Sequence, residues 1–176
     1  MELLRVLSLE SPVTEEEYLR LAADEIIERV YATLLEIYER RVRTIAEQAM
    51  PVIKNVFEKE SEKYKNIVVP ISDGKRIFSV VTNLEKAVKS EGKELVRSFL
   101  KSFILVSIDE AWKEQLRELD DLKQSVQNAS YEQKDPLLIY KFESFSLFQN
   151  MLVEVNKEVV SSVLKAHIPV QAEATE

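Results

Sequence analysis

The sequence predicts a mainly helical protein, in which a long antiparallel helical hairpin packs with a helical domain that carries a small β-hairpin. Three observations predict this fold. Only two glycines and five prolines interrupt the 176 residues, so long stretches lack the residues that break helices. Apolar residues recur at helical spacing over most of the chain. One Asp-Gly step lies between two runs of β-branched residues, which is typical of a hairpin.

Composition and charge exclude several classes of protein. Apolar residues make up 45% and charged residues 31% of the chain, a balance that can close a core. The formal net charge of −7 argues against a general nucleic-acid binder, because phosphate binding depends on clustered Lys and Arg. Without cysteine, the chain has no disulfide and no thiolate metal site. No apolar run approaches the roughly 20 residues of a membrane span, and no signal peptide is evident. We therefore expect a soluble, cytoplasmic chain.

The first long helix is predicted to follow Thr14, because Thr14-Glu15-Glu16-Glu17 has the spacing of a capping box. Pro51 lacks a backbone donor and is expected to end or kink this helix near Met50. A second helical stretch is predicted from Val52 to about Tyr64. The apolar residues of the first helix are Tyr18, Leu21, Ile27, Val30, Leu34, Tyr38, Val42, Ile45 and Ala49.

A β-hairpin is predicted within residues 67–81. The runs Ile67–Ile71 and Arg76–Val81 are rich in β-branched and aromatic residues, and Ser72-Asp73-Gly74-Lys75 lies between them as a tight turn. Pro70 favours an edge position. Because a two-stranded hairpin is marginal alone in water, this one is expected to lean on the helices.

A helical hairpin is predicted for the rest of the chain. Thr82-Asn83-Leu84-Glu85 reads as a second capping box, and a helical pattern runs from it toward Asn128 with Gly92 as its weak point. If continuous, this helix has about 45 residues and is roughly 65–70 Å long. A short polar loop follows. A second helix then begins with Asp135 as its cap and Pro136 as its first residue.

Each helix of the hairpin carries an apolar stripe. The first stripe comprises Leu105, Ile108, Trp112, Leu116, Leu119 and Val126. The second comprises Leu138, Phe142, Phe145, Phe148, Leu152, Val155, Val159 and Val163. Trp112 lies on its stripe and is predicted to pack in the core, so its truncation to Ala would cost about 3–5 kcal/mol if it were fully buried.

No catalytic chemistry is visible in the sequence. Neither Gly74 nor Gly92 has a second glycine nearby, so a phosphate-binding loop is not expected. His167 has no neighbouring ligand type and is interpreted as a solvated or helix-terminal histidine. The pairs Asp109-Glu110 and Asp120-Asp121 diverge by about 100° on a helix, which favours a solvated face over paired acid–base catalysis. We expect no catalytic residue, no metal and no cofactor in this chain.

Two motifs at fixed spacing resemble a known family. Residues 108–122 follow the pattern I-D-x-x-W-K-x-x-L-x-x-[ML]-D-x-L. Residues 130–136 read Ser-Tyr-Glu-Gln-Lys-Asp-Pro, and residues 140–145 read Tyr-Lys-Phe-Glu-Ser-Phe. Together they are similar to the G/S-Y-x-Q-K-D-P…Y-K-x-E-[SG]-F signature of the SecA preprotein translocase family. Residues that carry this structural signature are Trp112, Asp135, Pro136, Phe142 and Phe145.

The resemblance implies a domain organisation and a contact site. Residues 1–100 would form a helical wing-like domain, residues 101–168 the two-helix finger of the helical scaffold domain, and residues 169–176 a frayed tail. The loop between the finger helices would contact polypeptide and channel. The loop residues are Ser130, Tyr131, Glu132, Gln133 and Lys134, and Tyr131 matches the family's tip tyrosine. The short start before Thr14 suggests a fragment, and the β-hairpin does not match the family's general pattern.

The resemblance also implies a function. The chain would belong to the SecA protein-translocation motor, where it would position preprotein at the SecYEG channel and transmit motor movement without catalysing a reaction. Its expected partners are preprotein, SecYEG, the motor domains of the same protein and a second copy, with no nucleic acid. ATP and Mg would serve the full-length ATPase, which would associate peripherally with the inner face of the plasma membrane.

Two other interpretations remain open. The chain could be a self-contained helical scaffold or adaptor that binds a partner helix in a groove. A metal enzyme of the helical-bundle type would need Glu-x-x-His pairs on facing helices, and the sequence has none.

Overall fold

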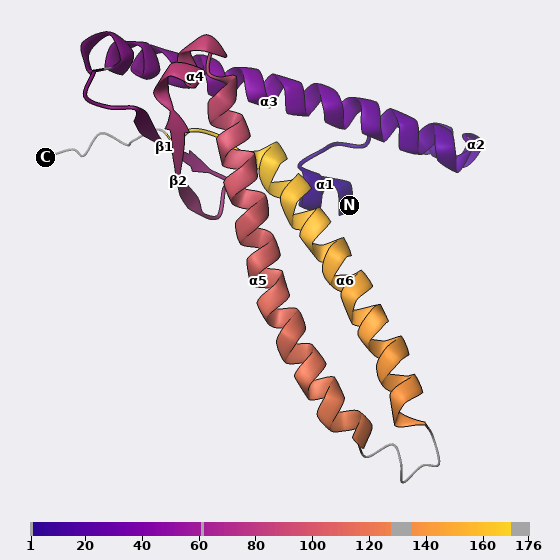
Figure 1. The fold of residues 1–176 in the computed structure, drawn as a ribbon. Coiled ribbons are helices and arrows are strands. Elements are labelled where there is room, and N and C mark those ends of the chain that lie inside the picture. Colours follow the sequence, from indigo (N-terminus) through magenta and orange to yellow (C-terminus); the bar gives the residue numbers. More distant parts are fainter. Residues whose placement is uncertain (1, 61, 128–134, 170–176) are drawn as a thin grey trace, which may run out of the picture. The chain divides into compact units, whose positions relative to one another are not determined.

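The computed structural model describes residues 2–60, 62–127 and 135–169. It confirms a mainly helical fold with one β-hairpin and a long helical hairpin (Figure 1). The elements are α1 (Glu2–Leu7), α2 (Glu15–Arg20), α3 (Ala23–Glu60), β1 (Asn66–Ser72), β2 (Ile77–Asn83), α4 (Leu84–Lys89), α5 (Lys93–Gln127) and α6 (Pro136–Lys165).

The chain forms two compact units. One comprises residues up to Ser102 together with those from Val160, and the other comprises Phe103–Val159. The boundary falls inside α5 and inside α6, so each of these helices contributes to both units. The division of the sequence at residues 100 and 168 stays a prediction.

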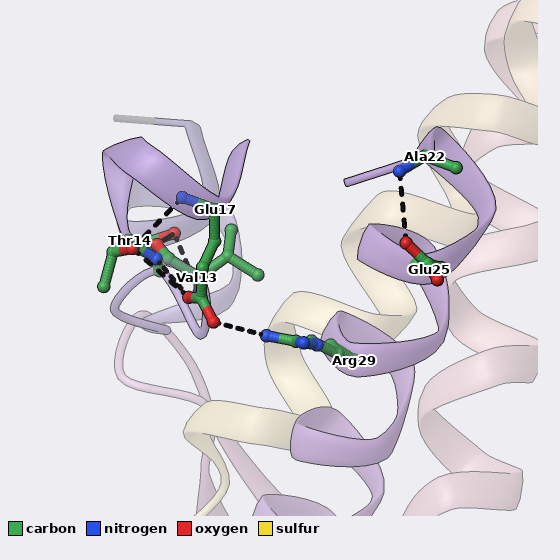
Figure 2. Close-up of polar contacts among 7 residues, drawn as sticks. Val13, Thr14, Glu17, Ala22, Glu25 and Arg29 are labelled. Atoms are coloured by element: carbon green, nitrogen blue, oxygen red, sulfur yellow. Dashed lines mark hydrogen bonds and ion pairs between the residues drawn. The ribbon is translucent and has the colours of Figure 1, made fainter. Parts of the chain in front are cut away.

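A corner separates α2 from α3, so the predicted single helix from Thr14 is wrong. The capping box itself is confirmed: the Glu17 N–H donates to Thr14 Oγ1 at 3.2 Å, and the Thr14 N–H donates to Glu17 Oε2 at 2.9 Å. After Arg20 the chain becomes extended, and the Ala22 N–H donates to Glu25 Oε2 at 3.2 Å where α3 begins. Figure 2 shows Arg29 of α3 reaching back to Glu17, with 2.8 Å between Nη1 and Oε1. The carboxylate of Glu17 therefore serves both the cap and the corner.

The helix α3 continues through Pro51 to Glu60, so it does not end near Met50, and the alternative expectation of a kink at Pro51 stays a prediction. Pro51 is exposed, while Ile45, Ala49 and Ile53 on either side of it are buried. A proline inside a helix costs about 3 kcal/mol. Burial of this apolar face on both sides of Pro51 outweighs that cost and keeps the helix in one piece.

The predicted β-hairpin is confirmed. β1 and β2 pair antiparallel, with Val68 opposite Val81 and Pro70 opposite Ser79. The hairpin leans on the helices as expected, because α4 contacts both α3 and β2. The ring of Phe78 also meets that of Phe99 in α5 edge-on, with 5.8 Å between the centroids.

Asn83 is the residue that caps α4, and not Thr82 as predicted. The Lys86 N–H donates to Asn83 Oδ1 at 3.0 Å. Thr82 is buried, and its hydroxyl accepts a hydrogen bond from Ser98 Oγ at 3.2 Å. Thr82 therefore stabilises the contact between β2 and α5 and is not available as a cap.

The predicted continuous helix after residue 84 is broken at its weak point. α4 ends at Lys89, and α5 begins at Lys93. Between them Glu91 and Gly92 both have positive φ, of 52° and 85°. At Gly92 the backbone passes so close to α3 that a Cβ would lie 2.9 Å from the Ala46 carbonyl oxygen. The turn therefore requires glycine for its conformation and for its proximity to α3.

Asp73 connects the hairpin turn to the end of α6. Its buried carboxylate, 2% exposed, accepts hydrogen bonds from the backbone N–H groups of Lys75 at 2.8 Å and Arg76 at 2.7 Å. Ser162 of α6 donates its hydroxyl to Oδ2 at 3.2 Å. Burial alone would raise the pKa of Asp73. Hydrogen bonds from the two backbone N–H groups and from Ser162, together with the charge of the Arg76 guanidinium, lower the pKa by more, so it lies below its ordinary value.

A short β-bridge reinforces this connection. The Ser72 N–H donates to the His167 carbonyl at 2.8 Å, and the His167 N–H donates to the Ser72 carbonyl at 2.9 Å. The side chain of His167 is exposed, as the sequence predicted, whereas its backbone extends the edge of β1. Residues 170–176 of the predicted frayed tail lie outside the described residues.

We predict that Gly92→Ala destabilises the protein by about 2–4 kcal/mol, because the added Cβ combines left-handed strain with a clash against Ala46. Gly74→Ala is the matched control. Gly74 has φ of 87°, but no atom lies within 4 Å of the place that a Cβ would take, so only about 1–2 kcal/mol is expected there. Chemical denaturation measures both values, and equal losses would contradict the close approach.

We predict that Asp73→Asn lowers the free energy of unfolding by about 1–3 kcal/mol at pH 7, because the amide replaces a charged acceptor. The pKa of Asp73 is lower in the folded protein than its ordinary value of 3.8. The charged side chain therefore stabilises the fold above pH 3.8, and this contribution is lost as the pH falls through the folded-state pKa. Urea titrations from pH 7 to pH 3 should therefore show the difference between wild type and variant narrowing. The exposed Asp120→Asn serves as control, and a constant difference would refute the role of the charge.

Candidate interaction surface

The unit formed by residues 103–159 is an antiparallel pair of helices, α5 and α6 (Figure 1). α6 begins as predicted: Pro136 is its first residue, and the Leu137 N–H donates to Asp135 Oδ1 at 2.9 Å. The rings of Trp112 and Phe148 meet edge-on across the pair, with 6.4 Å between the centroids. The helical hairpin expected from the two amphipathic stretches is therefore present.

One line of buried residues on α5 faces its partner helix. Its members recur every four or seven to eight residues, which places them on one side of the helix. They are Phe103, Ser107, Gln115, Leu122 and Val126. On α6, Val155 is buried within the same unit.

Two members of this line are polar. Ser107 Oγ and Gln115 Oε1 are buried and have no hydrogen-bond partner among the described residues. A buried polar atom without a partner costs roughly 1–3 kcal/mol. The pairing of α5 with α6 is therefore weaker than an all-apolar contact would be.

The predicted core position of Trp112 is wrong, because this side chain is 46% exposed. The predicted stripes of α5 and α6 lie mostly beside the buried line and not on it. Their exposed members are Leu105, Ile108, Trp112, Leu116, Leu138, Phe142, Phe145, Phe148 and Leu152. Truncation of Trp112 to Ala should therefore cost less than the roughly 3–5 kcal/mol that is typical of a fully buried tryptophan.

Parts of the two stripes form one apolar face. Ile108, Trp112 and Leu116 recur at four-residue spacing on α5, and the contact of Trp112 with Phe148 places the α6 stripe on the same side. On α6 the face is hollowed. A shallow pocket of 450 Å³ is lined by Lys141, Phe142, Ser144, Phe145 and Phe148. A contiguous exposed apolar face indicates an interaction site.

The charged face of α5 is solvated, as predicted. Lys113 pairs with Asp109, and Arg117 pairs with Glu114 at 2.8 Å, each along one helix face. No group of three His, Cys, Asp or Glu side chains that could hold a metal ion occurs within residues 2–60, 62–127 and 135–169. None of the helices in those ranges is both long and apolar enough to cross a membrane.

The predicted site residues fall into two groups. Ser130, Tyr131, Glu132, Gln133 and Lys134 lie outside the described residues. Asp135 and Pro136 start α6, and Phe142 and Phe145 lie on its exposed apolar face. The sequence motifs therefore flank the loop and extend into this face.

The fold and surface define a helical module that presents an exposed apolar face on a two-helix hairpin. A family model described as the SecA Wing and Scaffold domain matches residues 6–167, which include the β-hairpin. The chain belongs to the SecA Wing and Scaffold domain family.

Three relatives illustrate the match. The protein translocase subunit SecA of Phocaeicola vulgatus is 48% identical over 171 residues, which cover 97% of this chain and 16% of that protein. The subunit of Bacteroides thetaiotaomicron is 50% identical over 171 residues, with the same coverage of 97% and 16%. That of Christiangramia forsetii is 50% identical over 168 residues, covering 96% of this chain and 15% of that protein. The chain thus spans about 16% of the length of these relatives. No solved structure matches it.

We predict that Gln115→Leu stabilises the protein by about 1–3 kcal/mol, because it removes an unpartnered buried oxygen at nearly constant volume. Gln124→Leu, an exposed position on the same helix, is the control and should change the free energy of unfolding by less than about 0.5 kcal/mol. Thermal and urea unfolding measure both variants. A loss of stability in Gln115→Leu would mean that the amide is paired in solution.

Proposed function

We propose that this chain is the part of a protein translocase that positions preprotein polypeptide at the SecYEG channel and transmits movement to it through the α5–α6 hairpin. The apolar face of that hairpin carries the proposal, since Trp112, Phe145 and their neighbours are exposed although they lie on regular helices. Such a face needs an apolar partner surface. Membership of the SecA Wing and Scaffold domain family supports translocation as the process in which it acts.

The loop between α5 and α6 is the proposed contact with polypeptide and channel. Its residues Ser130, Tyr131, Glu132, Gln133 and Lys134 follow the family's signature in the sequence. A tyrosine offers apolar contact that tolerates many sequences, together with a polar hydroxyl. Gln133 and Lys134 add donors for backbone carbonyls or carboxylates of a passing chain.

Transmission of movement is proposed to use the helices as stiff elements. α5 runs without interruption from Lys93 to Gln127, a length of about 52 Å at 1.5 Å per residue. Its first residues belong to the unit that contains the β-hairpin, and Asp73 fixes the end of α6 in the same unit. A displacement at this anchored end is therefore carried along both helices.

Nucleotide hydrolysis is proposed to belong to other parts of a longer protein. The matched region covers 16% of the first relative, so that protein is about six times as long as the region. We propose that ATP and Mg bind there, that those motor domains cover the apolar face of the hairpin, and that the assembly acts at the inner face of the plasma membrane. This chain would then contribute no catalytic residue.

Photo-cross-linking from position 131 tests the proposal in the full-length protein that carries this chain, with a stalled preprotein in the channel. We expect cross-links to preprotein or to channel loops. Glu154, exposed on α6 about 30 Å along the helix from the loop, is the control position and should give none to preprotein. Cross-links only within the chain would overturn the tip contact and favour the self-contained adaptor, which would bind a helical partner without SecYEG.

We predict that Tyr131→Ala in the same full-length protein lowers the rate of polypeptide translocation at least about tenfold while basal ATP hydrolysis stays within about twofold, since the side chain contacts the substrate polypeptide and not the nucleotide. Tyr131→Phe retains the ring and should keep most of the activity. Normal translocation by Tyr131→Ala would rule out the proposed contact.

A further inference from the structure

The two outer edges of the β-hairpin differ in how they are protected. In an antiparallel pair, every second residue of each strand directs its backbone N–H and C=O groups away from the partner strand. The bridge to His167 shows that Ser72 is such a residue on β1. Pro70, two residues earlier, is therefore another, and it has no N–H to donate. The outer edge of β1 is thus partly paired and partly blocked.

The outer edge of β2 has neither form of protection. Ile77 lies opposite Ser72 in the register, so Ile77, Ser79 and Val81 direct their backbone groups outward. Within the part of the chain that the structure describes, no hydrogen bond to these groups is formed. None of the three is a proline or carries a charge, which are two common means of keeping an edge strand from pairing. The outer edge of β2 therefore remains open to a further strand.

The face of the hairpin to which these side chains belong is apolar. Val68 and Val81 lie opposite one another, and each is 57% exposed. Ile77 is 66% exposed and lies on the same face as Val81, because alternate side chains of a strand share a side. The other face is covered, since Ile71 and Val80 are buried. A strand added at the edge of β2 would thus extend an apolar face with its own alternate side chains.

The hairpin is basic, although the whole chain carries a net charge of −7. The hairpin and the three residues before it contain one acid, Asp73, which is buried. Their basic residues are Lys63, Lys65, Lys75 and Arg76. Lys75 lies in the turn, Lys65 lies at the opposite end of the strand pair, and neither forms an ion pair with any described residue. A strand bound along β2 therefore meets a lysine near each of its ends.

We propose that the outer edge of β2 binds an extended, acidic segment of another polypeptide, which pairs with Ile77, Ser79 and Val81 as a third strand. An extended backbone offers N–H and C=O groups at the spacing that a strand edge requires. Apolar side chains at alternate positions of the segment pack beside Ile77 and Val81, and its carboxylates meet Lys65 and Lys75. Binding at this edge does not require the role proposed for the α5–α6 loop.

The charges and the backbone groups together favour this occupant over two others. If two copies of the chain paired through β2, antiparallel strands would bring Lys75 of one copy toward Lys65 of the other, and parallel strands would bring each lysine toward its counterpart. An anionic membrane would suit the lysines and the apolar face, but it would leave the backbone groups of the edge unpaired. An acidic strand complements the backbone groups, the apolar face and the lysines at once.

Fluorescence anisotropy with a labelled peptide tests the site in the 176-residue chain. The probe is Asp-Asp-Val-Thr-Ile-Thr-Val-Asp-Asp, in which apolar residues alternate between acidic ends. We expect it to bind, and the same peptide with Lys in place of every Asp to bind at least about tenfold more weakly. No binding of the acidic probe up to about 1 mM would overturn the proposal.

Charge reversal on the protein tests the two lysines. Lys65→Glu with Lys75→Glu should weaken binding of the acidic probe at least about tenfold, because like charges then meet at both ends of the added strand. Lys101→Glu with Lys123→Glu, exposed on α5, is the matched control and should bind as wild type does. Equal weakening by both pairs of substitutions would mean that net charge alone governs binding, and would contradict a site on the hairpin.

Ser79→Pro tests the backbone pairing. It removes the central outward N–H of β2 and leaves the hydrogen bonds between β1 and β2 in place. Pro70 lies directly opposite Ser79 and already occupies an outward position of the same hairpin. We expect Ser79→Pro to weaken probe binding at least about tenfold, whereas Ser79→Ala keeps the N–H and should bind as wild type does. Circular dichroism establishes that both variants are folded.

Amide exchange followed by NMR locates the bound strand in the wild-type chain and needs no substitution. With the probe bound, the N–H groups of Ile77, Ser79 and Val81 should exchange at least about tenfold more slowly, while that of Val68 on the outer edge of β1 stays unchanged. Protection at Val68 and not at Ser79, or equal probe binding by Ser79→Pro, would overturn the proposal. Phosphatidylglycerol vesicles that bind wild type and Ser79→Pro alike, without any binding of the peptide, would assign the surface to a membrane instead.

Discussion

The arrangement around the β-hairpin depends on the hydrogen bonds that the buried carboxylate of Asp73 accepts. This carboxylate closes the hairpin turn through the N–H groups of Lys75 and Arg76, and it holds α6 through the Ser162 hydroxyl. A buried charge is stable only when its hydrogen bonds are complete, so the turn and the end of α6 must form together. The backbone bridge between Ser72 and His167 continues the same contact. Residues some 90 positions apart in the sequence (Asp73 and Ser162) are thereby joined in one compact unit.

The α5–α6 pair contrasts with this anchored end. Its buried line contains Ser107 and Gln115, whose oxygens have no partner among the described residues, while Trp112 and Phe142 remain exposed beside it. Apolar area left in water stabilises nothing until a partner covers it. The pair is therefore suited to exchange contacts with other surfaces, which agrees with the proposed role as a lever within a larger translocase.

Local signals in the sequence predicted local structure well. Thr14 and Asp135 cap helices because their side chains meet N–H groups only two or three residues away, and the Asp-Gly turn closes strands that are adjacent in the sequence. The break at Gly92 and the passage of α3 through Pro51 depend instead on packing between distant segments, such as Gly92 against Ala46. The error at Trp112 has a related cause. When apolar residues occupy a wide arc of a helix, periodicity does not tell which of two neighbouring lines faces the partner. The contact residues 130–134 were suggested by family resemblance alone.

Hydrogen exchange along α5 and α6 tests the central claim most directly, namely that one end of each helix is anchored while the remainder forms a weaker pair. Amides in residues 95–102 and 160–166 should exchange slowly, at the rate set by global unfolding, and those in residues 108–120 and 140–152 markedly faster. Asp73→Ala should then accelerate exchange at residues 160–166 and leave residues 108–120 unchanged. Uniform protection along both helices, or no response of residues 160–166 to the substitution, would contradict the account.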